Sequence, residues 1–357
     1  MTAAGVPSLG DARVLITGGA GFVGGNLVRA ILASSPGARI SVVDNLLSAE
    51  RFNVPDDSRV TFVEGSIADD EVLAGVVDDL DHVFHLATFH GNQSSIHDPL
   101  ADHDNNLITT LKLFERLRSF RRLRSVVYAA AGCAAAEKTF DGARATGEDA
   151  PLSLAQDSPY SISKLVGECY AVYYHRRHGL PTVRARFQNV YGPGEVLGAG
   201  RWRGTPATVW RNVVPTFVWK ALHGEPLPVE NGGVATRDFI YVDDICRGLL
   251  ACALRGAAGA VYNVATGREA SILSLAELVN RLTGNQAGVE FLPPRPWDSS
   301  GQRYGDPARA RVKLGFEAEV SLEQGLERTI DWTRTHESLI AACIRRHDRE
   351  MERATRG

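Results

Sequence analysis

Short apolar runs alternate with helical patterns along the first 190 residues. Residues 13–17 form an apolar, β-branched run, and residues 26–33 then carry apolar side chains at helical spacing. Further apolar runs and helical segments follow at 39–43, 60–63, 68–77, 83–87, 107–117 and 125–129. Strands that alternate with helices predict a parallel sheet covered by helices on both faces. We therefore expect an α/β fold with a doubly wound, Rossmann-type sheet.

A glycine-rich turn links the first predicted strand to the first predicted helix. It contains Gly18, Gly21 and Gly24, and Asp44 ends the next predicted strand 20 residues after Gly24. Glycines let a backbone turn tightly against a pyrophosphate, while the helix start offers free N–H groups. The carboxylate of Asp44 would accept hydrogen bonds from an adenosine ribose and repel a 2′-phosphate. The spacing predicts an NAD site formed by Gly18, Gly21, Phe22, Val23, Gly24 and Asp44.

Tyr160 and Lys164 stand one turn apart in a helix that is predicted to open at Pro159. Residues at i and i+4 share one face of a helix. A lysine ammonium lowers the pKa of a neighbouring phenol. A tyrosinate can then take a proton from a sugar hydroxyl while hydride leaves the same carbon. Following a dinucleotide turn, this pair predicts hydride chemistry with Tyr160 and Lys164 as catalytic residues that also contact the cofactor.

These motifs resemble those of the extended short-chain dehydrogenase/reductases, and within them the NAD-dependent epimerase/dehydratase family that acts on nucleotide sugars. The resemblance spans about residues 11–335 and includes the segments 186–193 and 236–244. It implies NAD as cofactor, a nucleotide-diphosphate sugar as substrate and a homodimer. It also implies cofactor contacts at Asn45, Ser66, Ile67, Leu86, Ala87, Thr88 and Asn106, and substrate contacts at Asn189, Arg237, Arg295 and Asp298.

Residues 192–215 are rich in glycine and also carry arginine and tryptophan. A long glycine-rich segment in a compact enzyme is typical of a lid or binding loop. We expect Arg201 in this segment to meet a substrate phosphate or carboxylate; a solvated surface loop or an oligomer contact is the alternative. His90 follows a predicted strand, at the edge where such sheets bind ligands, so we expect it to contact the sugar.

Two positions depart from the pattern of the resembled family. Ala131 stands where relatives have a Ser or Thr that hydrogen-bonds the reacting hydroxyl. Cys133 stands where 4,6-dehydratases have a proton-removing Glu, and where GDP-mannose 3,5-epimerase has a Cys followed four residues later by Glu, as Glu137 follows here. A thiol suits the removal of a proton made acidic by a 4-ketone. We predict Cys133 as a catalytic acid/base; a small core cysteine is the alternative.

Together these residues predict a nucleotide-sugar epimerase that uses tightly bound NAD⁺ and a transient 4-keto sugar. Inversion is expected at carbon 4 or, through Cys133, at carbon 5 or 3. A nucleotide-diphosphate hexose dehydratase and a uronic-acid decarboxylase are alternatives within the family. A catalytically weak, NAD-binding regulatory protein is the alternative from another class.

The predicted elements divide the chain into three parts. Residues 11–190 are predicted to form the NAD-binding domain, and residues 235–265 to return to it. Residues 191–335 are predicted to form mainly a smaller, mixed substrate domain. Residues 336–357 are predicted as a C-terminal helix, solvated or at an interface.

Composition indicates where the protein is expected to be located and which partners are unexpected. The chain has 39 basic and 42 acidic residues, a net charge of −3 that gives no reason to expect nucleic acid. Apolar runs stay short of the roughly 18 residues that a membrane span needs, and residues 1–9 lack the features of a signal peptide. The five scattered cysteines fit neither a metal site nor a disulfide framework. We therefore expect a cytoplasmic protein without metal, nucleic-acid or membrane partners.

Overall fold

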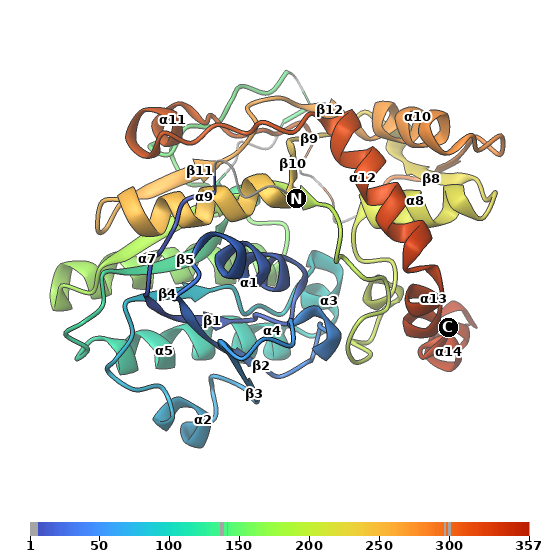
Figure 1. Ribbon diagram of the computed structural model, residues 1–357. Helices are drawn as coiled ribbons and strands as arrows, with labels where there is room; N and C mark the ends of the chain where they lie inside the picture. The colour runs from blue at the N-terminus through green and yellow to red at the C-terminus, as the bar shows by residue number, and fades with distance from the viewer. Residues whose placement is uncertain (1–5, 136–138, 141, 296–297, 299–300, 357) are drawn as a thin grey trace.

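A seven-stranded parallel sheet forms the centre of the molecule (Figure 1). The computed structural model describes residues 6–135, 139–140, 142–295, 298 and 301–356. The strand order is β11-β6-β5-β4-β1-β2-β3, and every neighbouring pair is parallel. The strands are β1 (Arg13–Thr17), β2 (Arg39–Asp44), β3 (Val60–Glu64), β4 (His82–His85), β5 (Ser125–Ala131), β6 (Thr182–Phe187) and β11 (Val261–Val264). The predicted Rossmann-type sheet is confirmed.

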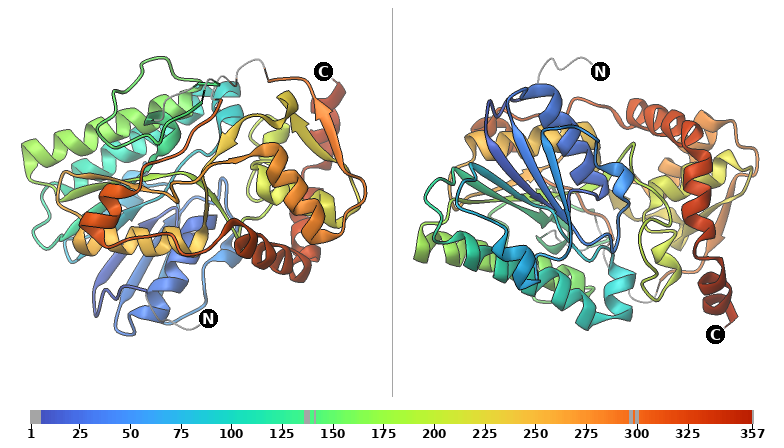
Figure 2. Two further views of the ribbon diagram at one scale, coloured as in Figure 1. Left: turned by 90° about the horizontal axis from the view of Figure 1, so that it is seen from above. Right: turned by 60° about the horizontal axis from the view of Figure 1, so that its bottom comes forward.

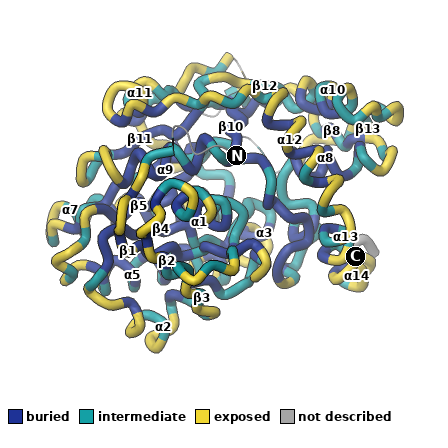
Figure 3. The backbone as a smooth tube through the Cα atoms, in the orientation of Figure 1, coloured by how far each residue is buried: buried dark blue, intermediate teal, exposed yellow. Residues whose placement is uncertain are grey.

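Helices cover both faces of this sheet, as Figure 2 shows. On one face lie α1 (Phe22–Ser34) and α9 (Val242–Arg255), and on the other lie α5 (Thr109–Leu117) and α7 (Pro159–His178). Side chains alternate along each strand, because successive Cβ atoms of a strand point to opposite faces. Val14 and Ile16 therefore pack beneath α1, while Leu15 between them packs beneath α5. The buried strands lie inside a shell of more exposed helices and loops (Figure 3).

The first half also contains shorter helical elements, most of which the sequence did not predict. They are η1 (Arg51–Asn53), α2 (Asp70–Ala74), α3 (Asn92–His97), α4 (Pro99–His103), the π-helical turn η2 (Asp104–Ile108) and α6 (Gly132–Ala135). The helix predicted over 68–77 is shorter, and the helix predicted over 107–117 is regular only from Thr109. The fourth strand ends at His85, so Leu86 and Ala87 belong to the loop that follows it.

Three two-stranded sheets and several helices lie together at one end of the large sheet (Figure 1). The strand pairs are β7 (Asn189–Tyr191) with β10 (Phe239–Tyr241), β9 (Thr236–Arg237) with β12 (Ala270–Ser271), and β8 (Leu227–Glu230) with β13 (Val289–Leu292). The helical elements are η3 (Pro206–Thr208), α8 (Val213–Leu222), η4 (Asn231–Gly233), α10 (Ile272–Thr283) and α12 (Leu322–Thr335). Helix α11 (Ala308–Leu314) lies apart from them, against β11 and α9. The chain returns to the large sheet through α9 and β11.

The C-terminal segment folds as two helices, whereas the sequence predicted one. These are α13 (Glu337–Arg345) and α14 (Asp348–Arg356), and the chain turns between them at Arg346 and His347. The turn is anchored, because the buried imidazole of His347 lies 2.9 Å from the carbonyl oxygen of Gly198. Within the described residues, no helix has the length and apolarity that crossing a membrane requires.

Candidate active site

A cavity of about 680 Å³ lies at the carboxyl edge of the parallel sheet. The ends of β1, β2, β4 and β5 open into it, which is where ligands bind in sheets of this kind. Most of the predicted site residues line this one cavity: Gly18, Gly21, Phe22, Val23, Gly24, Asp44, Asn45, Ser66, Ile67, Leu86, Ala87, Thr88, His90, Cys133, Tyr160, Lys164, Asn189, Arg237, Arg295 and Asp298. The sheet therefore brings together residues that are up to 280 positions apart in the sequence (298 − 18).

The glycine turn and Asp44 form one end of the cavity. Gly18 has a φ of +75°, and a Cβ added there would lie 2.6 Å from the backbone nitrogen of Ala87. Asp44 accepts hydrogen bonds of 2.9 Å from the N–H groups of Ala20 and Leu46, so its carboxylate fixes the loops on both sides. Burial raises the pKa of Asp44, and these hydrogen bonds oppose that shift.

The start of α1 suits a bound phosphate group. Phe22 opens the helix after Gly21, and no side chain in the described structure caps this end. Uncapped N–H groups at a helix N-terminus attract anions, and both Phe22 and Val23 line the cavity. Because the glycine turn, the uncapped helix and Asp44 adjoin one another, these residues fit the pyrophosphate and ribose of NAD.

Tyr160 and Lys164 reach the cavity from the first turns of α7. Ser158 caps this helix by accepting a hydrogen bond from the N–H group of Ser161, and Pro159 occupies the first helical position. The N–H group of Tyr160 donates to the hydroxyl of Ser95 at 3.1 Å, which joins α7 to α3. The Lys164 ammonium donates to the carbonyl of Ala129 at 3.1 Å and lies 5.8 Å from the centre of the Tyr160 ring.

Burial governs the protonation of this pair. It lowers the pKa of Lys164 to about 8, although the charges of Asp102 and Cys133 oppose the shift. Burial also raises the pKa of Tyr160, and Cys133 and Asp102 raise it further. The net direction for the Tyr160 pKa is thus upward, so burial outweighs any lowering by Lys164. Burial removes the phenol from water, which disfavours its charged form.

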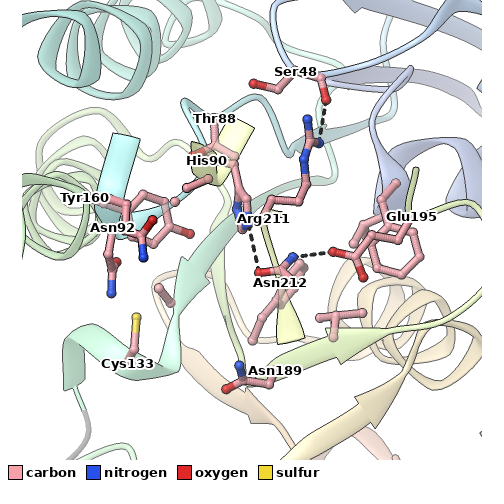
Figure 4. A pocket seen from close by; sticks show the side chains of 18 of the residues that line it. Ser48, Thr88, His90, Asn92, Cys133, Tyr160, Asn189, Glu195, Arg211 and Asn212 are labelled. Atoms are coloured by element: carbon pink, nitrogen blue, oxygen red, sulfur yellow. Dashed lines mark hydrogen bonds between the residues drawn. The ribbon is translucent and has the colours of Figure 1, made fainter. Parts of the chain in front are cut away.

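Cys133 lies in α6, directly after β5. Its thiol is partly exposed and lines the same cavity as Tyr160, and the close view shows both side chains at one end of the cavity (Figure 4). Ala131, at the end of β5, also lines the cavity and offers no hydroxyl. Glu137, which the sequence pairs with Cys133, lies outside the described residues.

Asn106 is buried and does not line the cavity; its side chain forms hydrogen bonds with other residues of the protein. Its carboxamide oxygen accepts hydrogen bonds from the Thr88 hydroxyl at 2.9 Å and the Phe89 N–H at 2.7 Å. Its nitrogen donates to Asp102 at 2.7 Å. The predicted direct contact of Asn106 with the cofactor is thus replaced by support of the loop after β4. The π-helical turn around Asn106 is of the kind often found at functional sites.

Arg201 is not at the cavity, which corrects the prediction of a substrate contact. Its side chain is exposed, beside a shallow pocket shared with Trp202, Arg346 and His347. The N–H group of Arg201 donates to the Leu47 carbonyl at 3.0 Å. The backbone at Arg201 is thus fixed against the loop after β2, while the Arg201 side chain faces outward.

The same segment supplies polar residues that the sequence analysis did not single out. Asn212 donates a hydrogen bond to the Glu195 carboxyl, and its oxygen lies 3.4 Å from Nε2 of His90 (Figure 4). Burial raises the pKa of Glu195 to about 7 and, together with Arg211 and Arg203, lowers that of His90 to about 4. His90 is therefore neutral at physiological pH. The only signal in the sequence for these groups is the glycine-rich composition of the segment.

Basic residues from β9 and from the segment after β13 also line the cavity. Arg237 donates at 2.7 Å to the carbonyls of Thr236 and Gly301, and its guanidinium lies 3.7 Å from the Asp298 carboxylate. Burial lowers the pKa of Arg237 to about 9. Arg295 pairs with Glu230 on β8. Among the described residues, no group of three His, Cys, Asp or Glu is arranged to hold a metal ion.

Comparisons with known proteins agree with this geometry. A sequence model described as the NAD dependent epimerase/dehydratase family matches residues 14–265. The UDP-glucose 4-epimerase of Mycolicibacterium smegmatis is 32% identical, over 90% of this chain and 98% of that protein. A trifunctional UDP-glucose 4,6-dehydratase/UDP-4-keto-6-deoxy-D-glucose 3,5-epimerase/UDP-4-keto-L-rhamnose-reductase of Arabidopsis thaliana is 27% identical over 90% of this chain. The chain spans about half of that plant enzyme, 47% of its length.

A solved structure is similar along nearly the whole chain. The crystal structure of the Bordetella bronchiseptica enzyme WbmF in complex with NAD⁺ and UDP has 58% sequence identity and a TM-score of 0.87. The superposition covers 96% of this chain and 98% of that chain.

Proposed function

Because the chain belongs to the NAD dependent epimerase/dehydratase family, we propose that it is a nucleotide-sugar epimerase that works through a transient 4-keto sugar. One observation carries the proposal: Tyr160, Lys164 and Cys133 line the same cavity as the dinucleotide turn. A hydride-transfer pair and a separate proton carrier therefore lie within reach of one bound sugar.

Tyr160 and Lys164 carry out the proton transfer at carbon 4, the carbon that is oxidised. Bound NAD⁺ would supply the acceptor for the hydride of carbon 4, and the donor that restores it at the end of the cycle. Tyr160 takes the proton of the carbon 4 hydroxyl and gives it back when the hydride returns. A charged Lys164 beside the phenol favours the tyrosinate, because opposite charges stabilise each other in a buried site.

Cys133 determines which carbon is inverted. A ketone at carbon 4 makes the protons at carbons 3 and 5 acidic, so a thiolate beside the ring can exchange them. Inversion at carbon 5 or 3 would use Cys133 in this way. Inversion at carbon 4 would need only Tyr160 and a rotation of the keto intermediate within the cavity.

The residues at the end of β5 favour epimerisation over loss of water. In the resembled dehydratases a carboxylate at position 133 removes the proton at carbon 5, and here positions 132 and 133 are Gly and Cys. The retained Tyr160 and Lys164 argue against a regulatory protein that only binds NAD. A dehydratase, a decarboxylase and a regulatory protein remain the outcomes that the test must separate.

At the substrate end, we propose that Arg237 and Asn189 hold the diphosphate of the nucleotide. The guanidinium fork of arginine matches phosphate oxygens, and both side chains line the cavity. A uridine nucleotide is the first choice to test, because the similar WbmF structure contains UDP. His90 is proposed to contact the sugar from the loop after β4.

Mass spectrometry in deuterated water tests the function directly. UDP-glucose, UDP-N-acetylglucosamine, UDP-glucuronic acid and dTDP-glucose would be incubated with the NAD⁺-loaded enzyme. An isomer carrying deuterium supports inversion at carbon 5 or 3 through Cys133, and one without deuterium supports inversion at carbon 4. Loss of water or of carbon dioxide would contradict the epimerase. A panel left unreacted by the NAD⁺-loaded enzyme would favour the regulatory protein.

Two further properties are also proposals. A homodimer is consistent with α7, which exposes Ile162 and Tyr173, and light scattering of the purified protein would test it. A cytoplasmic location is consistent with the five cysteines, all of which are free in the structure.

A further inference from the structure

Residues 192–212 form a strap between β7 and α8. The sequence left a solvated surface loop as one explanation for its glycines, but residues 194–200 are all buried. A Cβ on Gly198 would lie 2.6 Å from the carbonyl oxygen of Cys343, and one on Gly200 would overlap the carbonyl of Leu47. Both glycines also have φ values in the left-handed region. The backbone of the strap therefore packs directly against the backbone of α13 on one side and of the loop after β2 on the other.

The outer side of the strap is fastened to the turn between α13 and α14. The buried imidazole of His347 lies 2.9 Å from the Gly198 carbonyl oxygen. Arg346 forms an ion pair of 2.6 Å with Glu50 and donates to the carbonyl of Gly200 at 3.3 Å. The same Glu50 oxygen accepts a hydrogen bond of 2.9 Å from the N–H group of Gly200. Glu50 thus joins the strap, the C-terminal helices and the loop after β2.

An apolar cluster supports these polar contacts. Val196, Leu197 and Ala199 of the strap pack with Ile340 and Cys343 of α13, in a core separate from the two beneath the sheet helices. Burying these apolar side chains away from water stabilises the contact between the strap and α13. The strap and α13 are therefore expected to move as one unit.

The inner side of the strap faces the dinucleotide end of the cavity. The backbone N–H group of Arg201 donates to the Leu47 carbonyl at 3.0 Å, and the guanidinium of Arg211 donates to the Ser48 carbonyl at 2.9 Å. Leu47 and Ser48 line the cavity a few residues after Asp44. The strap also places Glu195, Arg211 and Asn212 in the cavity wall (Figure 4). It therefore closes the cavity beside the carboxylate that suits the adenosine ribose.

We propose that α13 and the turn after it hold this strap closed over the dinucleotide end of the cavity, and that Arg346 and His347 are positioning residues which slow the release of NAD. Reactions that return the hydride need this retention, because cofactor lost between the two hydride steps would leave a keto sugar. The proposal concerns cofactor retention alone and stands whether the enzyme is an epimerase or a dehydratase.

The test is the rate at which bound NAD⁺ exchanges with isotopically labelled NAD⁺ in solution, followed by mass spectrometry. We expect His347→Ala to raise the rate about tenfold, as a buried hydrogen bond is lost. Arg346→Ala should raise it about fivefold, because its ion pair is half exposed. Arg345→Ala, at the exposed neighbouring position, is the matched control and should leave the rate unchanged.

A second measurement separates retention from general stability. The melting temperature of each variant would be recorded without NAD⁺ and with saturating NAD⁺, since a ligand stabilises the fold according to its affinity. Unchanged exchange in both His347→Ala and Arg346→Ala would overturn the proposal, whatever their melting temperatures. Equal acceleration in Arg345→Ala would overturn it too.

Discussion

Ser163 donates a hydrogen bond of 2.5 Å to the buried carboxylate of Asp102. Asp102 lies on α4 and Ser163 directly precedes Lys164 on α7, so the bond places a negative charge near the Lys164 ammonium. Burial raises the pKa of Asp102, while Ser163 and Asn106 hold it down. Burial lowers the pKa of Lys164, and the charge of Asp102 is the largest influence that raises it again. The charge on Lys164 therefore depends on a residue that the sequence analysis did not select.

Asp102→Asn is expected to move the alkaline limb of the activity profile. Lys164 acts while protonated, so turnover should fall as pH rises through its pKa of about 8. Without the Asp102 charge that pKa falls, and activity should be lost at a lower pH. The profile of turnover against pH would be compared with that of Asp104→Asn, which removes an exposed carboxylate nearby. An alkaline limb that stays in place in Asp102→Asn would contradict this role.

Tyr160→Phe is expected to lower turnover by roughly 10²- to 10⁴-fold, which is the usual contribution of a positioned general acid/base to the rate. The ring and its packing against His90 remain, so the fold and the content of bound NAD should be preserved. Turnover and NAD content would be measured together on the substrate found in the panel. Tyr173→Phe, on an exposed part of α7, serves as the control. Full turnover in Tyr160→Phe would rule out the proposed chemistry.

Asp44→Ala is expected to weaken NAD⁺ binding by about tenfold or more. The change removes the acceptor for the N–H groups of Ala20 and Leu46, each hydrogen bond being worth about 1 kcal/mol. It also removes the charge that repels a 2′-phosphate, so the preference for NAD⁺ over NADP⁺ should narrow. Calorimetric titration of cofactor-stripped protein would measure both. Asp56→Ala, at an exposed position, should retain the original affinity and preference.

Glu168→Gln is expected to destabilise the fold by about 3 kcal/mol, as measured by urea unfolding. Glu168 forms two hydrogen bonds with Arg186, of 2.8 and 2.9 Å, and both side chains are buried. Breaking a buried pair leaves an uncompensated charge in the interior. The control is Glu317→Gln, whose pair with Arg311 is exposed and should contribute less than about 1 kcal/mol. Similar losses in the two variants would contradict the prediction.

Local patterns predicted the parts of the site that depend on neighbours in sequence. The glycine turn, Asp44 and the Tyr160–Lys164 spacing all follow from one strand, one turn or one helix face. Their positions at the carboxyl edge follow from parallel strands, which the alternation of apolar runs already indicates. For the same reason the sequence places His90 and Cys133 at this edge, since each follows a predicted strand, and both line the cavity.

The roles of Asn106 and Arg201 illustrate where this reasoning ends. Asn106 matches a family motif, yet its hydrogen bonds go to the loop of Thr88 and Phe89. Arg201 was chosen from the composition of the strap, while Arg211, ten residues later, lines the cavity. Composition identifies a segment that binds something, but the side of the segment that faces inward depends on what packs against it.

The sequence by itself determined the class of fold, the cofactor turn and the hydride pair, because each is a matter of local spacing. Only the tertiary structure decided that the strap is buried, that Glu195 and Asn212 meet His90, and that the C-terminal helices hold the strap. These arrangements rest on contacts such as Arg346 with Glu50, which are 296 residues apart. Packing between distant segments leaves no periodic or spacing signal in a single chain, because each partner alone resembles an ordinary polar or apolar surface residue.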